Sequence, residues 1–349
     1  MTDLSWPGIL STLLRGENLP DEAATWAMEQ ILGGHATPSQ IGGFLIALRA
    51  KGETVEEITA FVETMYRHAA PLQIDRRVVD IVGTGGDGAR TVNISTMAAV
   101  TIAGAAVPVV KHGNRASSSE SGSADVLEAL GVRLDVPVAD LAGVLDAVGI
   151  TFCFAPAFHP SMRFAGPTRK ELGIPTTFNF LGPLANPARP GAMAVGVSDL
   201  RMGELMAGVL AGRGIDALVF RGDDGLDELT TATTSTVWEV SGGAVRPTSL
   251  DPQELGISAS EPGALTGGDA EFNADVFRRV IAGEPGPVRE AVLLNAAAGI
   301  AAFDAASDSA AGSVNDRLAA ALTKARTSID SGSAARVLES WIAHTAEAI

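Results

Sequence analysis

One glycine-rich segment, DIVGTGGDGARTVNIST (Asp80 to Thr96), lies between a strand pattern and a helix pattern. Four glycines, Gly83, Gly85, Gly86 and Gly88, surround Thr84 and Asp87, and a polar cluster of Thr91, Asn93, Ser95 and Thr96 follows. Glycine permits positive φ and close approach of the backbone to a ligand, and free N–H groups at a helix start attract anions. The segment therefore predicts a strand–loop–helix unit that binds a phosphorylated ligand. Because the spacing matches neither GxxxxGK[ST] nor GxGxxG, we expect neither a P-loop nucleotide nor a dinucleotide.

Composition narrows the class of protein. The 349 residues suffice for two domains, and 46% of them are hydrophobic. A net charge of -16 argues against a nucleic-acid partner, which requires a basic surface. The single cysteine, Cys153, excludes an internal disulfide and a cysteine-rich metal site. The first residues lack a signal-peptide pattern and Met97–Val110 is too short to cross a bilayer, so we expect a cytoplasmic protein without a membrane partner.

Two kinds of periodicity divide the chain. Up to Pro71, apolar residues recur with helical spacing, which predicts a small all-helical N-terminal domain over residues 1–72. Beyond it, β-branched runs alternate with helical stretches, which predicts an α/β domain over 73–349 with a mostly parallel central sheet flanked by helices. The expected strands are 78–82, 107–111, 151–154, 194–198 and 217–221, with a hairpin near 237–243 at one edge and a loop over 305–313.

A second polar loop, VKHGNRASSSESGSAD (Val110 to Asp125), follows an apolar strand. It holds two fixed cations, Lys111 and Arg115, and a series of hydroxyl groups that suit phosphate oxygens. The alternative is a solvated loop in which Ser123 caps a helix. We favour the binding interpretation, because an apolar strand delivers KHGNR to the end of a strand where α/β sheets bind ligands.

A third segment, GDDGLDELTT (Gly222 to Thr231), contains four carboxylates and no basic residue. Carboxylate oxygens suit Mg²⁺, which takes one or two of them from a protein and its other ligands from water and phosphates. Asp-Gly is also a common turn dipeptide, and a charged turn is the better interpretation for Asp223 and Asp224. Asp227 and Glu228 are instead candidates to hold a metal against a polyphosphate.

A fourth segment, Phe154 to Pro190, is broken into short pieces by prolines and glycines. Its cations are Arg163, Arg169 and Lys170. The planar guanidinium matches a carboxylate with two hydrogen bonds, so the two arginines are candidates to bind a carboxylate-bearing substrate. Arginine on an exposed helix surface is an equally good interpretation of this segment alone. Cys153 and His159 are better interpreted as packing or loop residues than as catalysts.

In this order, the four segments resemble the anthranilate phosphoribosyltransferase family of tryptophan biosynthesis. The motifs that carry the resemblance are GTGGDG (83–88), NIST (93–96), KHGNR (111–115), SGSAD (121–125), FNFLGPLANPA (178–188) and GLDE (225–228). The likeness covers nearly the whole chain. Pyrimidine nucleoside phosphorylases are similar in plan, but KHGNR with GLDE favours the anthranilate enzymes. The alternatives are such a phosphorylase, or a nucleic-acid-binding relative without catalysis.

The resemblance implies a pentosyltransferase that converts phosphoribosyl pyrophosphate and anthranilate to N-(5-phosphoribosyl)anthranilate and pyrophosphate. It also implies two Mg²⁺ per monomer and a homodimer formed through the helical domain. A helical segment near 160–188 is expected to pack on that domain. Phe164 stands where relatives typically carry histidine, and Arg221 where histidine or a small residue is common.

The resemblance also assigns roles by motif. Phosphoribosyl pyrophosphate would contact Gly83, Gly86, Asp87, Thr91, Asn93, Ile94, Ser95, Thr96, Lys111, His112, Gly113, Asn114, Arg115, Ala116, Ser117, Ser118, Ser119 and Ser123. Anthranilate would contact Gly83, Asn114 and Arg169, and Mg²⁺ would be held by Ser95, Asp227 and Glu228. The carboxylate of Asp87 cannot favourably face bare phosphate, so we expect it to act through a metal-bound water or a ribose hydroxyl.

No side chain is assigned as a certain catalyst. The aromatic amine of anthranilate is already neutral near pH 7, so a strong base is not obligatory, and the expected catalysis is by positioning and electrostatics. His112 could accept the late proton, and a structural hydrogen bond is an equally good role for it.

Overall fold

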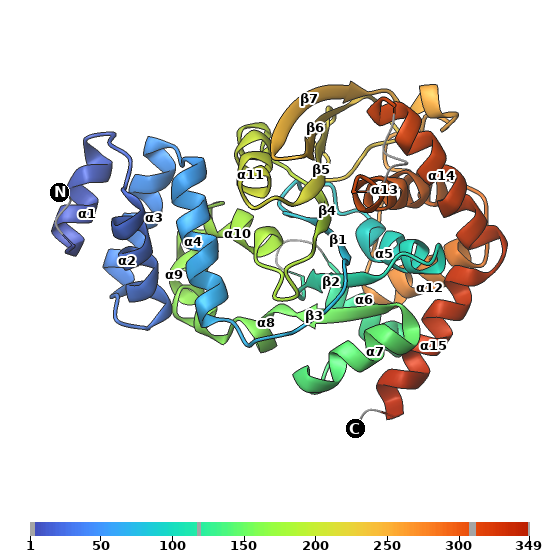
Figure 1. Ribbon diagram of the computed structural model, residues 1–349, viewed down its shortest axis with the longest axis horizontal. Coiled ribbons are helices and arrows are strands. Elements are labelled where there is room, and N and C mark those ends of the chain that lie inside the picture. The colour runs from blue at the N-terminus through green and yellow to red at the C-terminus, as the bar shows by residue number, and fades with distance from the viewer. Residues whose placement is uncertain (1–3, 117–119, 307–311, 348–349) are drawn as a thin grey trace. The chain divides into compact units, whose positions relative to one another are not determined.

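The computed structural model describes residues 4–116, 120–306 and 312–347 of the chain (Figure 1). It divides into two compact units. The first unit consists of Met1–Pro71 and Ala155–Pro187, and the second of Leu72–Phe154 and Ala188–Ile349. The helical segment expected near 160–188 therefore belongs to the first unit. No helix within the described ranges is long and apolar enough to span a membrane.

The first unit is helical. Its elements are α1 (Trp6–Leu14), α2 (Asp21–Leu32), α3 (Pro38–Lys51), α4 (Val55–His68), α8 (Ala155–Phe158), η2 (Pro160–Phe164), α9 (Gly166–Leu172) and α10 (Phe178–Leu184). Capping boxes at Thr37 and Thr54 start α3 and α4, since each hydroxyl accepts a backbone N–H of the first turn. The later segment is tied to the earlier helices by a buried bond of 2.6 Å from the Thr177 hydroxyl to Glu53.

The second unit is built on a seven-stranded sheet with the order β3-β2-β1-β4-β5-β6-β7. The strands are β1 (Val79–Gly83), β2 (Val109–Gly113), β3 (Ile150–Phe154), β4 (Ala192–Gly196), β5 (Asp216–Gly222), β6 (Ser235–Ser241) and β7 (Ala244–Leu250). The strands from β3 to β5 are parallel, and β6 and β7 form the antiparallel hairpin at one edge. The predicted mostly parallel α/β sheet is confirmed.

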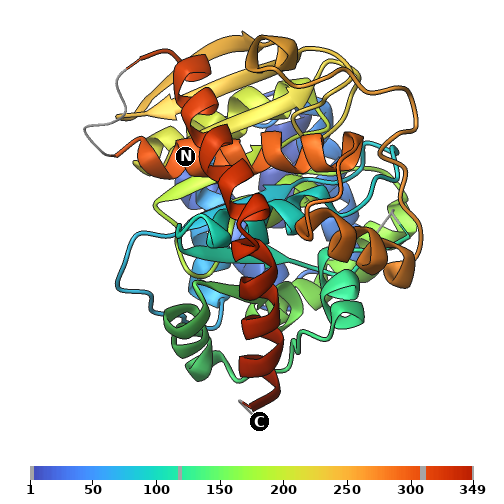
Figure 2. The same ribbon diagram turned by 90° about the vertical axis from the view of Figure 1, so that its right-hand side faces the viewer.

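Helices cover both faces of this sheet. They are α5 (Ile94–Gly104), α6 (Ser123–Leu130), η1 (Val138–Asp140), α7 (Leu141–Val148), α11 (Leu200–Gly212), η3 (Pro252–Leu255), α12 (Ala270–Ile281), α13 (Pro287–Asp304), α14 (Val314–Asp330) and α15 (Ser333–Glu347). Figure 1 shows α11 on one face, and α5 with α13 on the other. Figure 2 shows α14 and α15 running one after the other along the outside of that second layer. Of the predicted loop over 305–313, residues 307–311 lie outside the described ranges.

The order of the strands reverses in the middle of the sheet. From β1 the chain proceeds through β2 to β3 in one direction, and the next strand, β4, returns to the other side of β1. Ligands of open α/β sheets bind at such a reversal, outside the carboxyl ends of the strands. The loops that follow β1 and β4 therefore flank the expected ligand site.

Candidate active site

The glycine-rich loop leaves β1 at this reversal of strand order. Gly85, Gly86 and Gly88 have φ of 67°, 83° and 73°, values that side-chain-bearing residues rarely adopt. The loop is fixed to the end of β4, because the Thr84 N–H donates to the Gly196 carbonyl at 3.0 Å and the Ser198 hydroxyl donates to the Gly85 carbonyl at 2.8 Å. Its turn is thus held in place by hydrogen bonds within the protein.

The segment after β5 brings two carboxylates to the glycine loop. The Gly85 N–H donates to Asp227 Oδ2 at 2.6 Å. Two glycines make room for this segment: a Cβ on Gly83 would lie 2.4 Å from Asp227 Oδ2, and a Cβ on Gly196 would lie 1.7 Å from the Asp227 carbonyl oxygen. The ends of β1 and β4 therefore lack side chains where Asp227 and Glu228 pass.

Negative charge is concentrated at this point. Burial and the charge of Asp87 raise the pKa of Asp227 to about 7. Burial raises the pKa of Glu228 well above its usual range, with a further contribution from Asp227. A hydrogen bond from the Ser95 N–H, at the start of α5, acts in the opposite direction and lowers the pKa of Glu228. Ser95, the third predicted metal residue, therefore lies beside the carboxylate pair. One oxygen of Asp87, Oδ2, is buried and accepts no hydrogen bond from the described residues.

These groups fit a divalent cation that also binds water molecules or substrate phosphates. No three carboxylate, imidazole or thiol groups within the described ranges form a ready metal cage. Mg²⁺ rarely occupies such cages and typically combines one or two carboxylates with water and substrate phosphates. The crowded carboxylates and the unsatisfied Asp87 oxygen are the arrangement that a cation would stabilise.

Lys111 is the buried cation of the site. Its side chain on β2 donates to the Ile81 carbonyl at 2.6 Å and to the Ser95 hydroxyl at 3.3 Å, and the residue is 1% exposed. Burial lowers the pKa of Lys111, whereas the charges of Asp80 and Glu228 raise it. Asp80 in turn accepts the His112 N–H at 3.2 Å. The register of β1 and β2 is set by the Val79–Val109 pair. Further along, Lys111 of β2 binds a carbonyl of β1, and Asp80 of β1 binds an N–H of β2.

Arg115 holds the second polar loop in shape. Its guanidinium donates to both oxygens of Glu128, at 2.5 and 2.9 Å, and to Asp125 at 3.0 Å, and it lies over the Phe154 ring. Asp125 also accepts the N–H groups of Ala116 and Gly122. Arg115 was predicted to contact substrate, and in this structure its hydrogen bonds go to the protein. Ser117, Ser118 and Ser119 lie outside the described residues.

Hydrogen bonds tie the two polar loops together. The Asn93 amide donates to the Ser121 carbonyl at 3.0 Å and accepts from the Asn273 amide at 2.9 Å. The Thr96 hydroxyl donates to that of Ser123 at 3.2 Å. Of the other predicted contacts, Thr91 pairs with Thr266, Ile94 is buried at the start of α5, Gly113 ends β2, and Asn114 accepts the Arg115 N–H.

Sequence patterns did not single out several residues that shape the site. Asp80, Ser198, Asn273 and Asn295 belong to this group, because only the fold brings them to the loops. Arg221, which the sequence marks as a departure from the family pattern, has a structural role here: its guanidinium donates to the carbonyls of Ser198 at 3.1 Å and Gly222 at 3.3 Å.

Asp223 and Asp224 are turn residues, as the sequence favoured. Asp223 accepts the hydroxyls of Thr234 and Thr236, and Asp224 accepts that of Thr230 at 2.7 Å.

The helical unit contains the predicted carboxylate-binding cation. Arg169 is partly buried, its guanidinium lies 5.8 Å from the centre of the Phe178 ring, and burial lowers its pKa. Its Nε has no hydrogen-bond partner among the described atoms, which leaves a donor for a ligand. Lys170 is exposed, and Arg163 lies over the Phe164 ring at 4.7 Å. Phe164 itself packs on Gly34, where a Cβ would lie 2.8 Å from the ring.

Cys153 and His159 are both buried. Burial raises the pKa of the Cys153 thiol, and the His159 ring bonds to the Ala185 carbonyl at 2.9 Å. Both fit the packing role.

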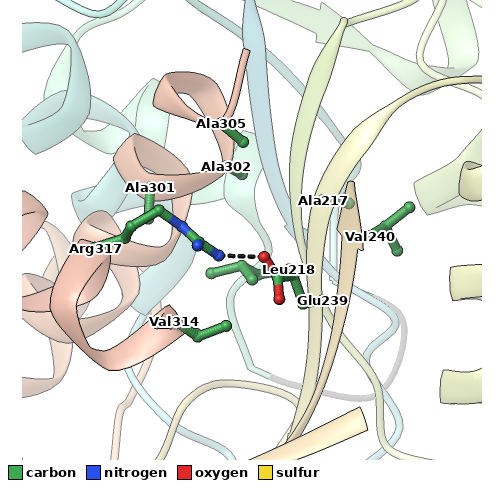
Figure 3. Close-up of a pocket in the computed structure, with 9 residues that line it drawn as sticks. All are labelled: Ala217, Leu218, Glu239, Val240, Ala301, Ala302, Ala305, Val314 and Arg317. Carbon is green, nitrogen blue, oxygen red and sulfur yellow. Dashed lines mark hydrogen bonds and ion pairs between the residues drawn. The ribbon is translucent and has the colours of Figure 1, made fainter. Parts of the chain in front are cut away.

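A small cavity between the sheet and α13 and α14 is unrelated to the site (Figure 3). Its volume is about 10 Å³, room for one water molecule at most. The Arg317–Glu239 ion pair closes it, and none of its lining residues comes from the phosphate loops. It is a small void beside a part-buried ion pair.

Known proteins match the chain in both sequence and fold. Residues 75–335 match the model of the glycosyl transferase family, a/b domain, and residues 7–69 match that of the glycosyl transferase family, helical bundle domain. Fold and site together thus define a glycosyltransferase with a helical and an α/β part.

Individual relatives narrow this class. An anthranilate phosphoribosyltransferase of a Nocardioides species is 59% identical over 343 residues, 98% of this chain and 99% of the relative. The crystal structure of anthranilate phosphoribosyltransferase from Thermus thermophilus superposes with a TM-score of 0.88 at 40% identity, over 97% of this chain and 99% of that one. The Saccharomyces cerevisiae enzyme in complex with phosphoribosyl pyrophosphate and Mg gives 0.87 at 27% identity, over 99% of each chain. The chain belongs to the anthranilate phosphoribosyltransferase family, and the resemblance drawn from the motifs is confirmed.

Proposed function

We propose that the chain transfers the 5-phosphoribosyl group of phosphoribosyl pyrophosphate to the amine of anthranilate and releases pyrophosphate. The observation that carries the proposal is the seating of Asp227 and Glu228 against the glycine loop at the reversal of strand order. Anion-binding loops alone would fit many phosphorylated ligands. A carboxylate pair that crosses a phosphate loop suits a polyphosphate bound together with a metal.

We propose that two Mg²⁺ ions per monomer bind at Ser95, Asp227 and Glu228. The support is the raised pKa of both carboxylates and the Ser95 N–H beside them. A related enzyme from yeast has been crystallised with phosphoribosyl pyrophosphate and Mg. When bound, Mg²⁺ would neutralise the charge that develops on the pyrophosphate leaving group. Asp87, whose Oδ2 is unsatisfied, would accept from a water in that shell or from a ribose hydroxyl.

The other loop residues would bind the sugar phosphate. Backbone N–H groups around Gly86 would face the pyrophosphate, and Lys111 would supply a positive charge from β2. Thr96 and Ser123 lie at the starts of α5 and α6, where N–H groups favour an anion. Ser119 and its neighbours remain predicted phosphate contacts.

Arg169 would bind the carboxylate of anthranilate through its unpaired Nε and so orient the amine, with Asn114 and Gly83 as further contacts. The amine is neutral near pH 7 and can attack the ribose carbon as positive charge develops there, in the manner of glycoside cleavage. The role of the protein is then to align two substrates and to stabilise the leaving pyrophosphate.

Turnover tests the proposal directly. Protein mixed with anthranilate, phosphoribosyl pyrophosphate and Mg²⁺ should generate the fluorescent product, and well-folded protein without turnover would overturn the function. Glu228→Ala should remove the Mg²⁺-dependent rate, whereas Glu204→Ala, at an exposed carboxylate of α11, should not.

The anthranilate contact needs its own test. Arg169→Ala should raise the KM for anthranilate more than the KM for phosphoribosyl pyrophosphate, because only the first substrate would lose a partner. Lys170→Ala, at the exposed neighbour, is the control. A change shared equally by both KM values would refute the assignment.

We further propose a cytoplasmic homodimer formed through the helical domain, without a nucleic-acid partner. The net charge of -16 supports the last point. Sedimentation velocity tests the dimer, and salt-sensitive binding to DNA would contradict the absence of a nucleic-acid partner.

A further inference from the structure

Helix α13 directs one buried polar side chain at the carboxylate segment. Its other buried residues are aliphatic or glycine, and Asn295 is 0% exposed. The Asn295 amide accepts the Leu229 N–H at 2.9 Å and donates to the Leu229 carbonyl at 3.0 Å. Its second N–H donates to the Ala291 carbonyl of the same helix at 3.0 Å. Both donors of the amide are therefore in use, and it binds both backbone groups of a single residue.

Leu229 directly follows Asp227 and Glu228, which makes this contact relevant to the site. Two hydrogen bonds to one residue, like those of paired strands, fix the backbone where the carboxylates emerge. On the other side, Gly83 and Gly196 give space to Asp227, and the Gly85 N–H donates to its carboxylate. Within the segment, the Leu226 carbonyl accepts the Gly222 N–H and the Thr230 N–H donates to the Ser235 hydroxyl. The two hydrogen bonds between Asn295 and Leu229, the Asn295 clamp, add a contact from α13 at the residue directly after Glu228.

The helix that carries the clamp is packed against the helix that carries Ser95. One turn beyond Asn295, Gly299 faces Ile102 of α5, where a Cβ would lie 2.5 Å from Cδ1. Such close packing allows little sliding between α13 and α5. Ser95 is in the first turn of α5. Through α13, Asn295 therefore links the backbone that carries the two carboxylates to the helix that carries the Ser95 hydroxyl.

We propose that Asn295 is a positioning residue of the metal site, holding Asp227 and Glu228 at the correct distance from Ser95. This inference rests on the proposed function, since it takes those three residues as the metal ligands. An asparagine is required because the contact needs one acceptor and two donors. Aspartate would lack the donors and add a further buried negative charge, and alanine would leave both backbone groups of Leu229 without a side-chain partner.

Metal affinity, measured independently of turnover, tests the proposal. Mn²⁺ serves as a paramagnetic substitute for Mg²⁺, and its binding to the full chain is followed by electron paramagnetic resonance with inorganic pyrophosphate present. We expect Asn295→Ala to raise the dissociation constant for Mn²⁺ about tenfold or more, the effect typical of losing an outer-shell partner. The half-saturating Mg²⁺ concentration in turnover should rise in parallel, and the KM for anthranilate should change by less than about twofold.

Ile300→Ala is the matched control, because Ile300 is buried on the same helix and its aliphatic side chain offers the carboxylate segment no hydrogen bond. It should lower the thermal midpoint and leave Mn²⁺ affinity unchanged. Equal loss of affinity in both variants, or unchanged affinity in Asn295→Ala, would overturn the positioning role alone. Wild-type protein that binds no Mn²⁺ would overturn the metal site as well. If Asn295→Ala does not fold, Asn295→Ser is held to the same criterion.

Discussion

Gly196 offers a sharp test of how the carboxylate segment is seated. In Gly196→Ala, the new Cβ would lie 1.7 Å from the Asp227 carbonyl oxygen, 2.5 Å from its carbon and 3.2 Å from the Glu228 nitrogen. Real Cβ contacts stay beyond 3.0 Å, so β4 or the segment must move by about 1.3 Å. The obstructing atoms belong to the backbone and cannot rotate away.

Two losses should follow from this displacement. Overpacking in a rigid interior costs about 1–3 kcal/mol, which a lower thermal midpoint would report. A shift of about 1 Å in the metal carboxylates should reduce kcat/KM by about 10²-fold. The same shift should weaken Mn²⁺ binding in the presence of pyrophosphate, because the ligands would no longer converge.

The control is Gly143→Ala on the exposed side of α7, where a Cβ meets no atom within 4 Å. Alanine in a helix is favoured over glycine by about 0.5–1 kcal/mol, so this variant should be as stable as the wild type or slightly more so. Wild-type activity and stability in Gly196→Ala would refute the close approach of the Asp227 backbone to β4.

Three further predictions concern the framework around the site. Asp80→Leu should destabilise the protein by about 3–5 kcal/mol in urea unfolding, since it leaves the buried Lys111 charge and the His112 N–H without their partner. Asp80→Asn keeps an acceptor and should lose less stability. Equal losses in the two variants would contradict this reasoning. Arg115→Lys should cost under about 1 kcal/mol, because the Glu128 pair is half-exposed and lysine replaces a two-point contact with one; a far larger loss would show that the pair is shielded from water. Burial lowers the pKa of His159, so its neutral ring contributes stability above pH 6.5 that is lost as the pH falls toward the folded pKa, at no more than about 1.4 kcal/mol per pH unit. His159→Gln should flatten that part of the profile, and an unchanged slope would exclude the histidine as its source.

Local signals in the sequence predicted most of the fold. The β-branched runs located β1 to β5 to within a few residues, because these strands bury apolar faces along a short stretch of chain. The capping box that starts α4 is equally local, since it joins Thr54 to Glu57, three residues further along the chain. Strands and helix caps can be predicted from the sequence because the residues that determine them lie close together in the chain.

The supports of the site were not readable in this way. Asn295 lies 66 residues from its partner Leu229, and in a helix of small apolar residues it carries no signal of its own. Gly196 is one of many glycines until the fold brings Asp227 against it. Arg115 illustrates a different case: its pattern indicates phosphate, and the structure adds three hydrogen bonds from its guanidinium to Glu128 and Asp125, which the pattern did not indicate. The residues of the site could be listed from motifs, but their supports follow from the topology.

The interrupted helical unit has a consequence for the order of synthesis. The hydrogen bond of Glu53 with Thr177 and that of Tyr66 with the Leu184 carbonyl join residues 124 and 118 positions apart in the chain. On a ribosome, helices α1 to α4 emerge well before α8 to α10 exist, and β1 to β3 emerge between them. The sheet likewise lacks β4 to β7 until the helical unit has been completed. Neither unit can therefore finish folding from a continuous piece of chain, and a ribosome that stalls before residue 187 would release a protein in which both are incomplete.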